Sequence, residues 1–227
     1  MKHREVRALL ATVTLIAVLL AMATVFAAAG DQKQPLTAEE QYARAKDAVL
    51  YVRSYYASGG VKATGSGFVV TQDGLAVTAA HVIDKGARVT AVTPEGKELD
   101  AVVVSCDTTS DVAVLRLPKG RYPALPMASA APNGGAVLRA MGWPIKDTLI
   151  ITEGLCSAPE ATVSEKDRTL VTCDVVNGMS GGPVLDRFGQ VVGLCSGSVR
   201  TMSGIHLSAR WEDINTAVNT AKKEAAK

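Results

Sequence analysis

The sequence is poor in aromatic residues and lacks the spacings typical of metal or phosphate sites. Phe, Trp and Tyr make up 4% of the 227 residues, and we interpret the isolated Trp143 and Trp211 as packing anchors. The cysteines form no Cys-x-x-Cys or Cys/His pattern, which argues against a structural zinc site. The chain also contains no internal repeat, low-complexity tract or phosphate-binding glycine loop. We therefore expect no metal and no cofactor.

The net positive charge of the chain comes from its first few residues. The N-terminal segment holds Lys2, Arg4, Arg7 and Glu5, and without it 21 basic residues face 21 acidic ones in the remainder. A nucleic-acid partner would require a dense Lys/Arg surface to neutralise its phosphates. We expect no nucleic-acid partner.

The N-terminal segment resembles an export signal. A basic start is followed by an apolar run from Ala8 to Phe26 and then by Ala27-Ala28-Ala29, a small-residue pattern that favours cleavage after Ala29. The alternative is that residues 1–29 are retained as a membrane anchor, because the run approaches the roughly 20 residues that span a bilayer. In either case residues 30–227 are exported, to the periplasm or to the exterior.

An oxidising compartment would permit disulfides in the exported part. Four cysteines allow three pairings, and the sequence does not decide among them. These cysteines are Cys106, Cys156, Cys173 and Cys195.

The body of the chain consists of short β-branched runs separated by turns. A stretch rich in Pro, Ala and Gly, residues 117–135, divides these runs into two β units. A capping box from Thr37 to Glu40 predicts a short helix before the first unit. Apolar residues at 214, 217, 218 and 221 predict an amphipathic C-terminal helix that packs on the second unit.

Two short motifs and an aspartate between them hold the residue types of a nucleophilic triad. Thr78-Ala79-Ala80-His81 offers an imidazole base, Asp111 precedes an apolar strand, and Gly178-Met179-Ser180-Gly181-Gly182 offers a hydroxyl in a glycine-rich turn. A serine needs a base to remove its proton and a carboxylate to orient that base. The chain order His, Asp, Ser matches the chymotrypsin order. Glycines around the serine would let the amides of Gly178 and Ser180 form an oxyanion hole.

Four segments resemble trypsin-like serine proteases, and the resemblance is closest to the HtrA/DegP type. It spans roughly residues 48–215. The segments are Gly65–Gly74, Thr78–Ile83, Asp111–Leu115 and Ser180–Val184.

This resemblance implies an all-β, chymotrypsin-like fold of two six-stranded antiparallel β-barrels with short N- and C-terminal helices. The barrels are expected at about residues 48–117 and 136–210, within a single protease domain of residues 30–227. It also implies a serine endopeptidase acting on unfolded or exposed protein segments, with His81 as base, Asp111 as orienting residue, Ser180 as nucleophile and Gly178 as oxyanion donor. The oligomeric state stays open.

Two features depart from the HtrA pattern. The chain ends soon after the protease domain, so no peptide-binding PDZ module is expected. Met179 stands where Asn or Asp is usual, and the preceding loop Val175–Asn177 is short. Activation by an aspartate paired with a new N-terminus is therefore not expected. The alternative function is a catalytically silent, trypsin-fold protein that binds peptides or acts as a chaperone.

The substrate-binding residues are predicted by their spacing from Ser180. Asp174 lies at the position of the trypsin specificity aspartate, but a structural aspartate at a strand end is the favoured interpretation. Cys195 and the following Ser196 and Gly197 are expected to line the specificity pocket, and a thiol there would suit small aliphatic side chains. His206 superficially resembles the Gly-x-His of acid-recognising relatives, but we interpret it as a strand residue near the pocket rim.

Overall fold

The computed structural model describes residues 34–199 and 201–225, together with His3, Arg7, Thr14 and Ile16. The predicted export segment, residues 1–29, lies outside the described residues apart from those four positions. Among the described residues, no helix is both long and apolar enough to cross a membrane. The chain divides into two units, Met1–Pro35 and Leu36–Lys227, and the second unit contains the fold.

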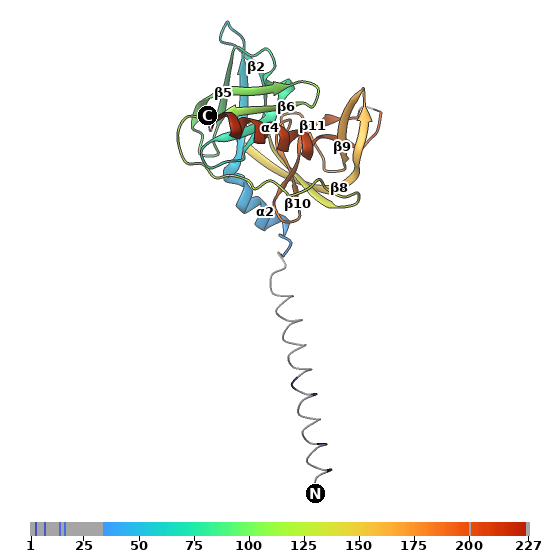
Figure 1. Ribbon diagram of the computed structural model, residues 1–227. Helices are drawn as coiled ribbons and strands as arrows, with labels where there is room; N and C mark the ends of the chain where they lie inside the picture. The colour runs from blue at the N-terminus through green and yellow to red at the C-terminus, as the bar shows by residue number, and fades with distance from the viewer. Residues whose placement is uncertain are drawn as a thin grey trace. The chain divides into compact units, whose positions relative to one another are not determined.

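Leu36–Lys227 contains two closed antiparallel barrels of six strands each (Figure 1). This confirms the predicted all-β, chymotrypsin-like fold. The first barrel has the order β1-β2-β3-β6-β5-β4 and the second β10-β11-β12-β9-β8-β7. The strands of the first barrel are β1 (Val49–Tyr55), β2 (Val61–Val69), β3 (Leu75–Ala79), β4 (Arg88–Val92), β5 (Glu98–Asp107) and β6 (Val112–Arg116). Those of the second barrel are β7 (Val137–Ile145), β8 (Thr148–Val163), β9 (Lys166–Val171), β10 (Pro183–Asp186), β11 (Val191–Ser198) and β12 (His206–Arg210).

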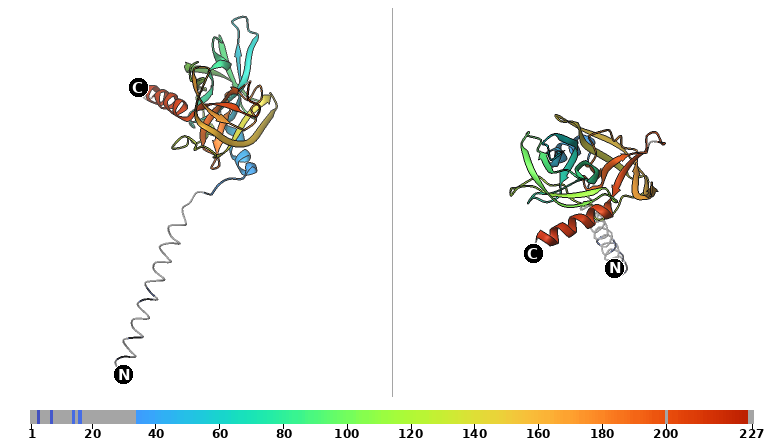
Figure 2. Two further views of the ribbon diagram at one scale, coloured as in Figure 1. Left: turned by 90° about the vertical axis from the view of Figure 1, so that its right-hand side faces the viewer. Right: turned by 90° about the horizontal axis from the view of Figure 1, so that it is seen from above.

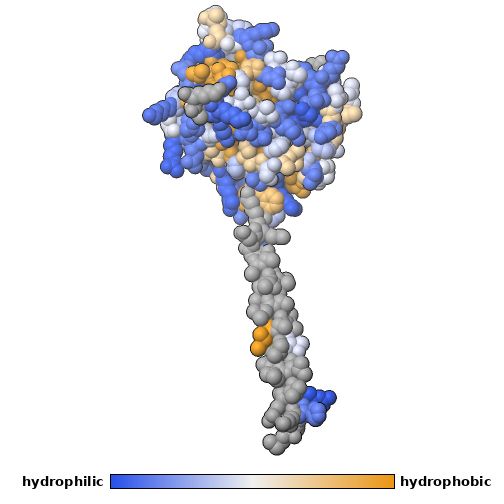
Figure 3. Space-filling view, in the orientation of Figure 1, coloured by the Kyte–Doolittle hydropathy of each residue, from blue (hydrophilic) through white to orange (hydrophobic). Residues whose placement is uncertain are grey.

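Each barrel is filled by its own apolar side chains. Phe68, Leu75 and Leu115 are buried in the first barrel, and Leu138 and Cys195 are buried in the second. Barrel closure pairs the strand edges that an open sheet would expose. On the face shown in Figure 3, hydrophilic residues predominate over the domain and hydrophobic ones form small separate patches. The packed interiors make the barrels rigid supports for the loops between them.

The cysteines are all free thiols. The structure therefore contains none of the three disulfide pairings that the sequence left open. Three of the thiols are buried and one is exposed. Cys106 is the exposed thiol, and Cys156, Cys173 and Cys195 are buried.

Helices frame the barrels at both ends of the domain. The predicted capping box is present: the Thr37 hydroxyl accepts from the Glu40 amide, and α2 (Ala38–Ala45) continues through the short η1 (Lys46–Ala48) into β1. The predicted C-terminal helix is α4 (Trp211–Ala225). It packs on β11 and β12 but also on β6, β3 and β5, so it lies across both barrels (Figures 1 and 2). The prediction had included the second barrel only.

The segment between the barrels is tied to both of them. The Leu125 amide donates to Val69 O in the first barrel, and Val191 N in the second donates to Pro126 O, each at 2.8 Å. Met127 adds an isolated parallel bridge to Val191. These bonds hold the two barrels in one arrangement, and the loops that carry the predicted triad come from both.

Candidate active site

His81 and Asp111 are brought together by the pairing of β3 with β6. Ala79, the last residue of β3, pairs with Val112, the first of β6. His81 lies in the short helix α3 (Ala80–Ile83), directly after β3, so this register sets Asp111 beside it. The Ala80 amide donates to Asp111 O at 3.1 Å, and the His81 amide donates to Asp111 Oδ1 at 3.0 Å. The backbone therefore fixes the carboxylate before the imidazole ring contributes.

The imidazole ring completes this contact. His81 Nδ1 lies 2.9 Å from Asp111 Oδ2 and 3.0 Å from Oδ1. A proton on Nδ1 would be held by the carboxylate, which leaves Nε2 as the basic nitrogen. The His81 side chain is 49% exposed and that of Asp111 only 8%. The base is thus open to a ligand while its orienting partner is enclosed.

Asp111 is held in a conformation that few residues adopt. Its φ angle is +63°, in the left-handed region that Asp tolerates better than most non-glycine residues. Burial raises the pKa of the Asp111 carboxyl, but hydrogen bonding and charge from His81, with a bond from Ser196, outweigh it and lower the pKa below its usual value. The carboxylate therefore stays ionised beside the imidazole.

Ser196 is part of this carboxylate site. Its hydroxyl donates to Asp111 Oδ2 at 2.5 Å, which links β11 of the second barrel to the His81–Asp111 pair of the first. We predicted a substrate-binding role for Ser196. The structure commits the hydroxyl to Asp111, so only the backbone of this residue is left for a substrate.

The loop that carries Ser180 is anchored to the first barrel. Ser180 O accepts from the Ser66 amide at 2.7 Å, and the Ser66 hydroxyl donates to Gly178 O at 2.8 Å. The same hydroxyl accepts from the Trp143 amide at 2.8 Å. Ser66 is fully buried in β2. Sequence reasoning placed it in a family motif without a role, and the only available signal was its position between Gly65 and Gly67.

Gly181 allows the Ser180 loop to approach the strand that leads to His81. Its φ angle is +89°, and a Cβ there would lie 2.5 Å from Thr78 Oγ1 and 2.7 Å from Ala79 N. Only glycine fits this contact. Ser180 therefore lies beside the end of β3. Among the described residues, no hydrogen bond joins the His81 ring to the Ser180 hydroxyl. Long or missing catalytic hydrogen bonds are common in enzymes without substrate, and they tighten when the substrate binds.

The backbone amides around Ser180 are available to a ligand. Within residues 34–199 and 201–225, the amides of Gly178 and Ser180 have no hydrogen-bond acceptor. Gly178 follows Asn177 in a turn closed by the Met179 amide donating to Val176 O at 3.0 Å. Its φ of +94° suits the third position of a type II turn. A free pair of N–H donors at this turn is the arrangement that an oxyanion hole requires.

Met179 anchors the same loop on its other side. Its side chain is fully buried in the core of the second barrel, in one apolar cluster with Leu138, Ala140 and Cys195. A carboxylate at this position would be buried among apolar side chains, without a counter-charge in that cluster. The departure from the family pattern thus replaces a polar anchor with hydrophobic packing.

The predicted pocket residues have different surroundings. Asp174 is exposed, and its Oδ1 lies 3.7 Å from His206 Nε2. His206 Nδ1 is buried and has no hydrogen-bond partner within residues 34–199 and 201–225. Cys195 is fully buried and its pKa is strongly raised by burial. Its side chain presents no surface to a substrate, so the expectation of a pocket lined by this thiol was wrong. Gly197 lies after a register shift in β11 at φ +149°.

The fold and this site define a class of protein. Two six-stranded barrels, with a His–Asp pair supplied by one and a Gly-x-Ser-Gly-Gly turn supplied by the other, form a trypsin-like peptidase domain. Among the described residues, no group of three or more His, Cys, Asp and Glu side chains could hold a metal ion.

Comparison with known proteins identifies the family. Residues 65–194 match the model of the trypsin-like peptidase domain, and because this is more than half of the chain, the chain belongs to that family. It is 31% identical over 169 residues to the mitochondrial serine protease HTRA2 of Bos taurus, a match covering 70% of this chain and 36% of the relative. It is 33% identical over 165 residues to a "Probable periplasmic serine endoprotease DegP-like" of Halomonas elongata, covering 70% of this chain and 35% of the relative.

The fold is also found among solved structures. The serine endoprotease from Yersinia pestis superposes with a TM-score of 0.73 at 23% identity, covering 85% of this chain and 69% of that one. The match spans only about a third of the length of the curated relatives.

Proposed function

We propose that this protein is an exported serine endopeptidase that cleaves unfolded or exposed protein segments through an acyl-enzyme. The observation that carries the proposal is the ionised Asp111 carboxylate held 2.9 Å from His81 Nδ1. This contact leaves His81 Nε2 as a base toward the adjacent Ser180 loop. The family and its HtrA and DegP-like relatives support the same reaction class.

The proposed reaction starts at Ser180. His81 Nε2 removes the hydroxyl proton as Ser180 Oγ attacks the substrate carbonyl carbon, and the resulting oxyanion is stabilised by the amides of Gly178 and Ser180. The imidazolium is stabilised by Asp111 and then donates its proton to the departing amine, which leaves an ester on Ser180. Water, deprotonated by His81, hydrolyses this ester and restores the enzyme. Apart from substrate and water, the scheme uses only groups of this chain.

An extended substrate is proposed to add as a strand along β11. β10 pairs with β11 only as far as Leu194, which pairs with Pro183, whereas β11 continues to Ser198 with β12 on its other side. The edge of Ser196–Ser198 is therefore open for backbone hydrogen bonds with a peptide. Such binding requires an extended chain, which unfolded segments provide.

Export is the second part of the proposal. Residues 1–29 are proposed to act as a cleaved signal, with retention as an anchor as the alternative. DegP-like relatives named as periplasmic support a periplasmic location. Intact-mass measurement of the exported protein will identify its N-terminus: a chain starting at Gly30 supports cleavage, and one that still contains residues 1–29 contradicts it.

Hydrolysis of an unfolded protein tests the enzymatic proposal. Reduced and alkylated casein and a folded, disulfide-intact protein are incubated with the wild type, with Ser180→Ala, and with Ser157→Ala, which removes an exposed serine. We expect new peptide termini only from the unfolded substrate, with Ser157→Ala active and Ser180→Ala inactive. Tight casein binding without cleavage by the wild type would instead indicate the alternative, a silent peptide-binding protein.

A further inference from the structure

A cavity of about 480 Å³ lies beside the His81–Asp111 pair, and both barrels contribute to its walls. The first barrel supplies Lys62 and Asp84 next to His81, and the second supplies Lys166 and Arg168 from β9. Ser196 of β11 also lines it. The cavity therefore adjoins both the base and the edge along which a substrate is proposed to bind.

The three cations of this cavity have only backbone partners. Lys62 Nζ donates to Asp84 O, and Lys166 Nζ donates to Thr108 O at 2.9 Å. Arg168 donates to the carbonyls of Asp167 and Thr109 at 2.7 and 3.1 Å. Within the described part of the chain, no carboxylate forms an ion pair with any of the three.

The carboxylates of the cavity do not balance this charge. Asp111 is engaged by His81 and Ser196. Asp84 is the other acidic residue that lines the cavity. Only this one carboxylate, which is not engaged by the His81 site, is therefore available to balance three cations. Arg168 is only 4% exposed. Burying a guanidinium away from a counter-charge is unfavourable unless an anion is supplied.

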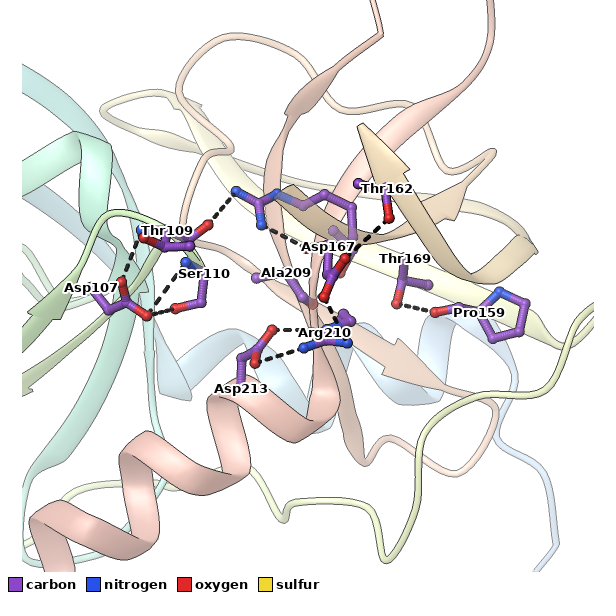
Figure 4. A network of polar contacts seen from close by, with 12 residues as sticks. Asp107, Thr109, Ser110, Pro159, Thr162, Asp167, Thr169, Ala209, Arg210 and Asp213 are labelled. Carbon is purple, nitrogen blue, oxygen red and sulfur yellow. Dashed lines mark hydrogen bonds and ion pairs between the residues drawn. The ribbon is translucent and has the colours of Figure 1, made fainter. Parts of the chain in front are cut away.

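Polar contacts outside the cavity hold the segments around Lys166 and Arg168 before any ligand binds (Figure 4). Asp107 accepts from the Thr109 amide at 2.8 Å and from the Ser110 hydroxyl at 2.7 Å, which sets the turn whose carbonyls hold Lys166 and Arg168. Asp167, which lies between the two cations in sequence, is 3.5 Å from Arg210 and accepts from the Thr162 hydroxyl at 3.2 Å. A cation held in a rigid position loses little entropy when an anion binds.

We propose that this cavity selects an acidic side chain in the part of the substrate that precedes the cleaved bond. The inference rests on the proposed function, because it takes the acyl part of the substrate to lie along Ser196–Ser198. Glu or Asp would place its carboxylate between Lys166 and Arg168, while a neutral residue of equal size would leave both cations without an anion. Charge-assisted hydrogen bonds of this kind correspond to a preference of about tenfold or more.

Quenched-fluorescent peptides of eight residues test the proposal. One cleaved sequence is chosen, each of the four residues before the bond is changed in turn to Glu, Gln or Lys, and kcat/KM is measured with wild type, Lys166→Gln and Arg168→Gln. We expect Glu to exceed Gln by about tenfold at one position, mainly through KM, and less at 0.5 M than at 0.05 M NaCl. Each variant should reduce that ratio severalfold.

Two further variants make the result specific. Lys97→Gln removes an exposed lysine outside the cavity and should keep the Glu preference. Lys166→Glu should abolish it, because the two remaining cations then face two carboxylates. Lys166 is exposed, so its variants test the cavity even if Arg168→Gln fails to fold. Equal rates for Glu and Gln at all four positions in the wild type, or an unchanged preference in Lys166→Glu, would overturn the inference.

Binding separates this inference from the proposed function. The same peptides are titrated into Ser180→Ala and followed by fluorescence anisotropy. Tighter binding of the Glu peptide, with no hydrolysis by the wild type, would refute the endopeptidase but retain the acidic-residue cavity. Hydrolysis with no difference between Glu and Gln in rate or binding would refute the cavity and retain the endopeptidase.

Discussion

The buried hydroxyl of Ser66 is predicted to hold the Gly178–Ser180 turn, the proposed oxyanion hole, from the opposite barrel. It donates to Gly178 O and accepts from the Trp143 amide, both at 2.8 Å. Ser66→Ala removes both hydrogen bonds and leaves the Gly178 carbonyl and the Trp143 amide unsatisfied in a buried site. Each such group costs about 1–3 kcal/mol. We expect a loss of about 2–4 kcal/mol in the free energy of unfolding, measured by urea denaturation.

The effect of Ser66→Ala on reactivity should be separate from its effect on stability. If the turn that Ser66 holds through Gly178 O loses its position, the proposed oxyanion donor Gly178 N–H is lost, which is worth about 3 kcal/mol and about 100-fold in rate. Covalent labelling of Ser180 by a fluorophosphonate, followed by intact mass at a temperature where the variant stays folded, measures this rate.

Ser208→Ala is the matched control. Ser208 is equally buried and also makes two hydrogen bonds, to the Leu194 amide and to Ala209 O, but none to the Gly178–Ser180 turn. It should lose comparable stability and label at the wild-type rate. Labelling of folded Ser66→Ala within twofold of the wild type would refute the role assigned to the hydroxyl.

Three further predictions concern single residues. Gly178→Ala should lose labelling while it still folds, because a Cβ would lie 2.7 Å from Pro144 Cα at a φ of +94°; unchanged labelling would contradict the proposed hole. The lowered pKa of Asp111 means that its carboxylate stabilises the folded state fully above about pH 4, the pKa in the unfolded chain, and that this stabilisation is lost as pH falls through the folded pKa. Asp111→Asn should therefore flatten the acid dependence of the free energy of unfolding, measured in urea between pH 2 and 7. A variant with the same acid dependence as the wild type would contradict this. Iodoacetamide at pH 8 should alkylate only the exposed Cys106 in the native protein and all four thiols in urea. The other three thiols are buried, and burial raises the pKa of Cys173 to about 11. Alkylation of a second thiol in the native protein, counted by mass, would contradict this packing.

Local patterns were sufficient to predict two β units with a helix at each end, and the resemblance to trypsin-like proteases added the two six-stranded barrels. The short β-branched runs, the stretch between the units and the capping box at Thr37 each depend on residues close in sequence. The contact between His81 and Asp111 follows from the pairing of β3 with β6, and the motifs of the family mark both strands. These features could therefore be predicted without the structure.

Features that depend on tertiary contacts were missed or mistaken. Ser66 acquires its role only when the loop of the other barrel docks on it. Cys195 was expected in a pocket, but its thiol is fully buried in the core of the second barrel. The strand shifts register directly after it, between Cys195 and Gly197, and a sequence period does not reveal such a bulge. Arg168 lies far from His81 and Asp111 in sequence, and only the docking of β9 against the Thr109 turn brings it to the cavity.

Fluorophosphonate labelling of the full chain tests the central claim most directly. Intact mass and peptide mapping are compared for the wild type, Ser180→Ala and His81→Ala. The account predicts one adduct per chain, located on Ser180, none on Ser180→Ala, and labelling slower by at least 100-fold in His81→Ala. A folded wild type that takes up no probe, or an adduct on another serine, would contradict it.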